Sequence, residues 1–462
     1  MIDLLIRDGR VVFDNEVKSF DIAVEGGRVA AIGHDLGPGR ETIDAAGLHV
    51  FPGLIDAHVH FNEPGRTDWE GVATGSAALA AGGGTAFFDM PLNSDPPLLT
   101  GEQFDAKRRA AEAASVTDFA LWGGLTPDNL DDLDDLAERG VIGFKAFMSG
   151  SGIAEFNAAD DLTLYRGMQV AKRHGLIVAV HAESDSMTAA LTKEIRGRGG
   201  KSWKDYLASR PIVAEVEATQ RAITLAAEVG CKLHIVHVTN SRSVELVRLA
   251  KSHSGADVTC ETCPHYLALT ADDLEAIGPR AKCAPPLRAK QDAEKLWQDL
   301  AFGKFAFVAS DHSPAPENLK SGDDAFDIWG GIAGVQSTLA VLLSREPKLA
   351  RPMVARMIAS GVADRFGLAG KGRIAVGHDA DFALVDVNAA YTLTRDMLLD
   401  RHKLSPYVGR SFKGVVRRTL VRGRTVFRDG RVTSPPIGRM LRPALVSQTG
   451  AAPTGTDALS TS

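Results

Sequence analysis

Eight short apolar segments recur through the middle of this chain, and stretches with helical spacing lie between them. The helical stretches include residues 161–174, 215–229 and 241–252. Alternating strand and helix signals are typical of βα units, and eight such units predict a (β/α)8 barrel, the TIM barrel of parallel strands. The eight predicted strands are residues 54–58, 85–90, 118–122, 142–147, 177–181, 233–237, 257–262 and 305–310.

The two ends of the chain carry short β-prone segments separated by turn residues instead. These segments are residues 4–6, 10–13, 21–24 and 29–32 at the N-terminus and residues 381–385 and 415–427 near the C-terminus. We therefore predict a small β-sandwich domain built from both termini. The predicted domains are residues 1–52 and 371–440 for the two parts of the sandwich, 53–370 for the barrel, and 441–462 for a flexible tail of largely small and polar residues.

Charge and cysteine content exclude several classes of protein. The 462 residues include 52 basic and 58 acidic side chains, a net charge of −6, which argues against a nucleic-acid partner. No apolar run approaches the roughly 20 residues of a membrane helix, so we expect no membrane contact and no signal peptide. Four cysteines are too few for a disulfide scaffold, which favours a reducing, cytoplasmic location. We interpret Cys260-x-x-Cys263 as buried structural cysteines, because no second pair stands at zinc-finger spacing.

Side chains that can bind metal ions lie at or near the C-terminal ends of five of the eight predicted strands. They are His58, His60, Lys145, His181, His237 and Asp311. The strands of such a barrel end at one mouth, where the active site lies, so these side chains are expected to meet there. Each one alone has an ordinary alternative: a buried core histidine, an ion-paired lysine or, for Asp311, a helix N-cap.

Imidazole and carboxylate ligands together suit zinc, manganese, iron or cobalt. Four histidines and one aspartate exceed what one tetrahedral zinc ion needs, so we predict two divalent metal ions joined by a bridging anion. A protonated Lys145 would repel the ions. Burial lowers the pKa of a lysine, and the neutral amine can add carbon dioxide, so we predict that a carbamate on Lys145 is the bridge.

Longer motifs surround these residues and carry a family resemblance. They are Pro52-Gly53-Leu54-Ile55-Asp56-Ala57-His58-Val59-His60, Gly143-Phe144-Lys145 and Ser310-Asp311-His312-Ser313-Pro314. In these motifs the chain resembles the cyclic amidohydrolases, a family that includes dihydroorotases, dihydropyrimidinases (hydantoinases) and allantoinases. The resemblance covers about residues 1–440, including the split β-sandwich.

Within that family the chain most resembles the allantoinase branch. The motifs that carry this resemblance include Glu63-Pro64-Gly65-Arg66, Asp89-Met90-Pro91-Leu92-Asn93, Ser209-Arg210-Pro211, Glu261-Thr262-Cys263-Pro264-His265-Tyr266, Lys282-Cys283-Ala284-Pro285-Pro286 and Arg401-His402-Lys403-Leu404-Ser405-Pro406-Tyr407. Dihydroorotases carry a carboxylate-binding arginine where this chain has Asn62, and a neutral amide cannot form that charge pair. Dihydropyrimidinases carry a tyrosine shortly after the modified lysine, and residues 146–152 contain none.

The resemblance implies hydrolysis of allantoin to allantoate in purine breakdown. It implies that His58, His60 and Asp311 hold the more buried metal ion, that His181 and His237 hold the second, and that carbamylated Lys145 and a hydroxide bridge them. Asp311 is expected to act as general base and then general acid. Zinc is the default ion, with manganese, cobalt or iron as alternatives, and the assembly is expected to be a homotetramer. Four polar residues near strand ends are the substrate-binding candidates: Asn62, Asn93, Ser149 and Ser313.

Two other functions remain open at this stage. A hydantoinase or dihydropyrimidinase would keep the mechanism and act on dihydrouracil or 5-substituted hydantoins. A non-catalytic scaffold on the same fold would have lost metal ligands, and the presence of all six candidate ligands argues against it.

Overall fold

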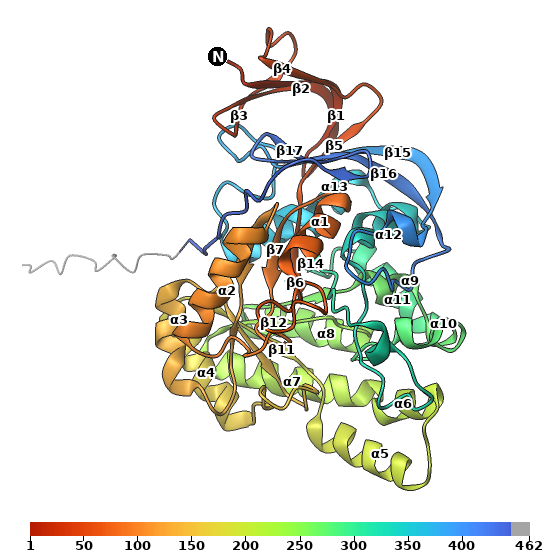
Figure 1. The fold of residues 1–462 in the computed structure, drawn as a ribbon. Helices are drawn as coiled ribbons and strands as arrows, with labels where there is room; N and C mark the ends of the chain where they lie inside the picture. Colours follow the sequence, from red (N-terminus) through yellow and green to blue (C-terminus); the bar gives the residue numbers. More distant parts are fainter. Residues whose placement is uncertain (445–462) are drawn as a thin grey trace, which may run out of the picture.

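The computed structural model describes residues 1–444 and places a barrel of parallel strands at the centre of the molecule (Figure 1). Strands β6, β7 and β8 pair in one parallel sheet, and β9 to β14 pair in a second. The strands are β6 (Leu54–Val59), β7 (Gly84–Asp89), β8 (Asp118–Leu121), β9 (Gly123–Gly124), β10 (Phe144–Phe147), β11 (Ile177–His181), β12 (Lys232–Ile235), β13 (Val258–Thr262) and β14 (Phe307–Val308).

Backbone contacts at both seams close these two sheets into one barrel. β8 and β9 are two parts of one strand position, separated by Trp122, and the amide of Ile142 donates to the carbonyl of Leu121 at 2.8 Å. At the other seam, Val59 and His312 form a parallel bridge, and the amide of His60 donates to the carbonyl of His312 at 2.8 Å. The eight strand positions confirm the predicted (β/α)8 fold, and the long apolar strands are buried along their whole length.

Helices connect and surround the strands, and each buries one face. In α7 the small residues Ala214, Ala218, Ala222 and Ala226 recur every four positions and are all buried, which is the spacing of one helix face. The helices are α1 (Val72–Ala81), α2 (Gly101–Ala114), α3 (Leu133–Arg139), α4 (Asp161–Arg173), α5 (Asp185–Gly197), α6 (Trp203–Ser209), α7 (Ile212–Val229), α8 (Ser241–Leu249), α9 (Pro264–Ala268), α10 (Ala271–Ile277), α11 (Lys290–Ala301), α12 (Thr338–Ser344), α13 (Arg351–Ala355) and α14 (Gly361–Phe366).

Both ends of the chain enter one further sheet, which lies at the top of Figure 1. β5 pairs with the N-terminal strand β1 on one side and antiparallel to the C-terminal strand β15 on the other. Its strands are β1 (Leu4–Val12), β2 (Val17–Glu25), β3 (Arg28–Gly33), β4 (Glu41–Asp44), β5 (His49–Pro52), β15 (Phe382–Thr392), β16 (Ser411–Val421), β17 (Arg424–Arg428) and β18 (Arg431–Val432). Apolar side chains from both ends, including Ile6, Ile22, Phe382 and Leu420, form one core within this layer.

The end of β5 at Pro52 and the start of β6 at Leu54 support the proposed boundary between sandwich and barrel. Most of the expected flexible tail lies outside the described residues. Its first residues are attached to the barrel, since the amide of Leu441 donates to the carbonyl of Phe119 and that of Ala444 to the carbonyl of Gly367. Over residues 1–444, no helix is both long enough and apolar enough to cross a membrane.

Candidate active site

Three of the predicted ligands converge at the seam between the first and last barrel strands. His58 lies in β6, His60 follows directly after it, and Asp311 follows β14. Oδ1 of Asp311 lies 3.2 Å from Nε2 of His58 and 3.3 Å from Nε2 of His60. All three side chains are buried, and their ligand atoms lie close enough together to hold one metal ion.

Two more predicted ligands meet beside this group. His181 ends β11, and His237 follows β12. Nδ1 of His181 lies 3.1 Å from Nε2 of His237, and the ring of His237 is 5.5 Å from that of His58 between centroids. The two groups of ligands are therefore adjacent, as a centre with two metal ions requires.

Lys145 extends from β10 and ends as a buried amine. Its Nζ has no hydrogen-bond partner among residues 1–444, and burial lowers its pKa to about 8. Burial, together with the nearby Lys145, also holds the pKa values of His58 and His237 well below the usual range, so both rings are neutral, which is the form that binds metal. A lysine amine with a lowered pKa and two groups of neutral imidazoles fit a pair of divalent ions bridged through a modified lysine.

Four residues around the site have backbone conformations in the left-handed region, which side chains other than glycine rarely adopt. Their φ values are 64° for Asn62, 71° for Asn93, 40° for His237 and 46° for Asp311. Such strained residues cluster at functional sites, where the surrounding fold holds them in place. The left-handed conformation of His237 also ends the regular alternation of side chains between the two faces of β12. Sequence spacing alone therefore could not show which way the side chains next to His237 point.

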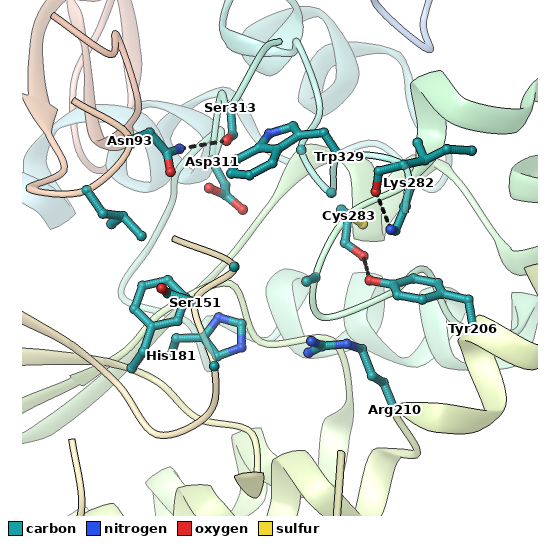
Figure 2. A pocket seen from close by; sticks show the side chains of 18 of the residues that line it. Asn93, Ser151, His181, Tyr206, Arg210, Lys282, Cys283, Asp311, Ser313 and Trp329 are labelled. Carbon is teal, nitrogen blue, oxygen red and sulfur yellow. Dashed lines mark hydrogen bonds between the residues drawn. The ribbon is translucent and has the colours of Figure 1, made fainter. Parts of the chain in front are cut away.

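A cavity of about 380 Å³ opens above these ligands (Figure 2). His58, His60, His181, His237 and Asp311 line it at one end. Two predicted substrate-binding residues also line it, and Nδ2 of Asn93 donates to Oγ of Ser313 at 3.4 Å. The wall also includes side chains that were not predicted to bind substrate, although some of them stand in the family motifs: Tyr206, Arg210, Lys282, Cys283 and Trp329.

The other two predicted substrate-binding residues do not line this cavity. Asn62 and Ser149 are both fully buried. Neither the Asn62 amide nor the Ser149 hydroxyl finds a hydrogen-bond partner in the described part of the chain. Their assignment to substrate binding stays a prediction.

Two buried glutamates contact the candidate ligands and were missed by the sequence reasoning. Oε1 of Glu261 lies 2.7 Å from Nδ1 of His58, and Oε2 of Glu183 lies 2.8 Å from Nε2 of His181. Glu183 stands two residues after its histidine, whereas Glu261 lies 203 residues away on β13. No local spacing could have connected Glu261 to His58, although Glu261 opens one of the motifs that carry the family resemblance.

The match to a family model decides where this chain belongs. Residues 49–426 match the model of the amidohydrolase family, a range that covers the whole barrel and, in the further sheet, β5, β15 and β16. The chain belongs to the amidohydrolase family. Membership confirms the resemblance seen in the sequence and the expectation of a metal-dependent amide hydrolase.

Individual relatives within the amidohydrolase family are similar over nearly the whole chain. The allantoinase of Solibacter usitatus is 54% identical over 446 residues, which cover 96% of this chain and 97% of the relative. The allantoinase of Deinococcus radiodurans is 52% identical, over 96% of this chain and 99% of the relative. A solved structure, the L-hydantoinase (dihydropyrimidinase) from Arthrobacter aurescens, superposes with a TM-score of 0.93 at 34% identity, over 96% of this chain and 100% of that chain.

Proposed function

We propose that this amidohydrolase opens the cyclic amide of allantoin to give allantoate, in purine breakdown. The observation that carries the proposal is the site geometry: two adjacent groups of imidazole and carboxylate ligands, together with a buried amine, at one end of a polar cavity. The identity of 54% to an allantoinase over 96% of the chain supports allantoin as the substrate.

His58, His60 and Asp311 would hold one divalent ion, and His181 and His237 the other. Carbamylated Lys145 would link them, and the pKa of about 8 supports this because a neutral amine is the form that adds carbon dioxide. When bound, the two ions supply hydroxide at neutral pH and polarise the carbonyl group under attack. We take zinc as the ion, with manganese, cobalt or iron as alternatives.

The protein's own side chains bind the substrate and move the proton. Asn93 and Ser313 lie at the cavity wall, where an amide and a hydroxyl can pair with the neutral amide groups of allantoin. The carboxylate of Asp311 takes the proton from the attacking water and delivers it to the ring nitrogen. A carbon–oxygen bond forms, the ring carbon–nitrogen bond breaks, and the proton from water ends on the departing nitrogen.

A hydantoinase or dihydropyrimidinase is the second candidate. The superposition on an L-hydantoinase with a TM-score of 0.93 supports it, but the identity is only 34% against 54% for an allantoinase. Both candidates share the mechanism and differ in the substrate that the cavity accepts.

The setting proposed for this activity is the cytoplasm, with a homotetramer as the assembly. All four cysteines are buried free thiols, which supports a reducing compartment. The mass of the purified particle by light scattering tests the tetramer.

An activity panel tests the function directly. Protein supplied with divalent metal and bicarbonate is offered allantoin, dihydrouracil, hydantoin and dihydroorotate, and we expect clear preference for allantoin. Lys145→Ala is expected to lose this activity, and Lys193→Ala, on the exposed face of α5, to retain it. Preference for dihydrouracil or hydantoin would overturn the substrate and keep the mechanism. Full metal loading without turnover of any ring would overturn the function.

A further inference from the structure

Two candidate ligands are each held by a buried glutamate on the ring nitrogen that faces away from the metal position. Nδ1 of His58 contacts Glu261 at 2.7 Å, while its Nε2 lies 3.2 Å from Asp311. In His181 the two ring nitrogens have the opposite roles: Nε2 contacts Glu183 at 2.8 Å, while Nδ1 lies 3.1 Å from Nε2 of His237. Both glutamates are at most 1% exposed.

We propose that Glu261 and Glu183 are positioning residues that set the affinity of the two metal positions separately, Glu261 through His58 and Glu183 through His181. A carboxylate that accepts the N–H of one ring nitrogen fixes the tautomer and makes the other nitrogen a better ligand. This inference rests on the metal centre of the proposed function but not on its substrate.

The direction of each hydrogen bond around Glu261 follows from which of the neighbouring groups can donate. Nδ1 of His234 lies 2.8 Å from the hydroxyl of Thr259, and Nε2 of His234 lies 3.2 Å from Oε2 of Glu261. A neutral imidazole has one donor and one acceptor. A carboxylate can only accept, so Nε2–H of His234 donates to Glu261, and the Thr259 hydroxyl then donates to Nδ1. The other carboxylate oxygen is then free to accept Nδ1–H of His58, which leaves Nε2 of His58 unprotonated toward His60 and Asp311.

Glu183 is held by a different kind of group, the guanidinium of Arg210. Arg210 donates from Nη1 to the same oxygen, Oε2, that contacts His181. Figure 2 shows the Arg210 side chain extending toward His181 at the edge of the cavity. Glu183 is thus held by a guanidinium and Glu261 by an imidazole and a backbone amide, the amide of His237 at 3.4 Å. The two glutamates share no partner among these contacts, so Glu183→Gln should leave the first metal position intact. Glu261 also accepts the amide of His237, a candidate ligand of the second position, so Glu261→Gln should affect the first position more than the second.

Metal titration of two isosteric variants tests this proposal. Glu261→Gln and Glu183→Gln keep the side-chain volume but remove the negative charge and one acceptor. Stepwise dissociation constants for Zn²⁺ or Co²⁺ are measured by chelator competition. Two ligand variants show which binding step belongs to which position: the step weakened in His60→Ala is the first position, and the step weakened in His237→Ala is the second. We expect Glu183→Gln to weaken the His237 step about 10–100-fold and leave the His60 step unchanged, and Glu261→Gln to weaken the His60 step about 10–100-fold and the His237 step much less.

A third buried glutamate provides the matched control. Glu215 accepts from the amide and hydroxyl of Thr239 and pairs with Arg288, and it contacts none of the candidate ligands. Glu215→Gln is expected to lower thermal stability and leave both metal steps at the wild-type value. Wild-type metal affinity in both test variants would overturn the proposal. Equal weakening of both steps, in proportion to the loss of stability seen in Glu215→Gln, would also overturn it.

The same titration separates this inference from the proposed substrate. A wild-type protein that binds two ions but leaves allantoin intact refutes the substrate and still reports on the two glutamates. A wild-type protein that binds no divalent ion refutes both.

Discussion

The carboxylate of Asp311 contacts two imidazoles and also faces the cavity, so its position suits both roles proposed for it, metal binding and proton transfer. Asp311→Asn keeps the shape and one ligand oxygen but removes the proton acceptor. We expect kcat for allantoin to fall about 10²–10⁴-fold, the usual contribution of general acid–base catalysis. The measurement is steady-state turnover at a measured metal content.

A carboxylate on the protein surface provides the control for Asp311→Asn. Asp134 pairs with Arg173 on the exposed side of the barrel, and Asp134→Asn is expected to keep the wild-type kcat. An Asp311→Asn protein with two bound ions and wild-type kcat would remove Asp311 from the proton pathway.

The lowered pKa of Glu183 predicts how the stability of the metal-free protein changes in acid. Burial alone would raise its pKa, but Arg210 and the hydrogen bond to His181 lower it to about 2. Because the folded pKa lies below the unfolded value, this carboxylate stabilises the fold above about pH 4.5, by up to about 3 kcal/mol, and the stabilisation is lost as the pH falls toward 2. Urea unfolding should therefore show a large difference between wild type and Glu183→Gln at pH 7 that shrinks by pH 3. A difference that stays constant with pH would contradict the charged pair.

At the residue scale, sequence reasoning reached the candidate ligands that converge in the barrel but not the two glutamates that contact them. His58, His60 and Lys145 stand in motifs with fixed spacing, so the sequence alone singles them out as candidates. His234 precedes His237 by three residues, a spacing that in a regular strand puts two side chains on opposite faces. The left-handed conformation of His237 ends the strand alternation, and His234 reaches Glu261 inside the barrel. Contacts between strands depend on barrel register, which sequence does not reveal.

Among the connecting elements, the segment after β14 shapes the cavity through a close backbone approach. A Cβ atom on Gly331 would lie 2.1 Å from the carbonyl oxygen of Ser313 and 2.9 Å from its Oγ. Gly331→Ala must displace Ser313 or its own segment, so we expect a loss of about 1–3 kcal/mol in stability and a raised KM for allantoin. Urea unfolding and steady-state kinetics measure the two effects.

The adjacent glycine, Gly330, is the control for the contact with Ser313. A Cβ atom on Gly330 meets nothing closer than 3.8 Å, and Gly330 also lines the cavity. Gly330→Ala should be neutral or stabilise by up to about 1 kcal/mol, because alanine restricts the unfolded chain. Equal losses in both variants would show that the contact with Ser313 is not the reason.

The elements themselves were largely predictable. All eight barrel strands were expected near their observed positions, because parallel strands buried on both faces read as continuous apolar runs. β14 is only two residues long where six were expected, since hydrogen bonding at the closing seam passes to isolated bridges at His312. The β-prone segment predicted at 415–427 is two strands, β16 and β17, joined by a turn at Arg422-Gly423. Both turn residues have positive φ, as a tight hairpin requires.

For the whole molecule, the sequence predicted that the two chain ends share one domain but not how that domain attaches to the barrel. The attachment includes a buried ion cluster. Nζ of Lys371 lies 2.6 Å from Asp118 at the start of β8, and 2.9 and 2.7 Å from Asp379 and Asp381 before β15. Burial alone would lower the pKa of Lys371, but the three carboxylates raise it well above its usual value. Lys371 is therefore protonated at neutral pH.

Removing this one cation tests how the sheet and barrel are held together. Lys371→Met keeps much of the volume and leaves the three carboxylates with Arg422, which pairs with Asp118, and the exposed Arg28, which pairs with Asp379. We expect a loss of about 3–5 kcal/mol in unfolding free energy, because breaking a buried pair strands uncompensated charge. Arg28→Met is the control: Arg28 also pairs with Asp379, at 3.8 Å, but its side chain is 65% exposed, so we expect less than about 1 kcal/mol. Similar losses in the two variants would mean that the cluster contributes no more than a surface ion pair, and that apolar contacts alone join the two layers.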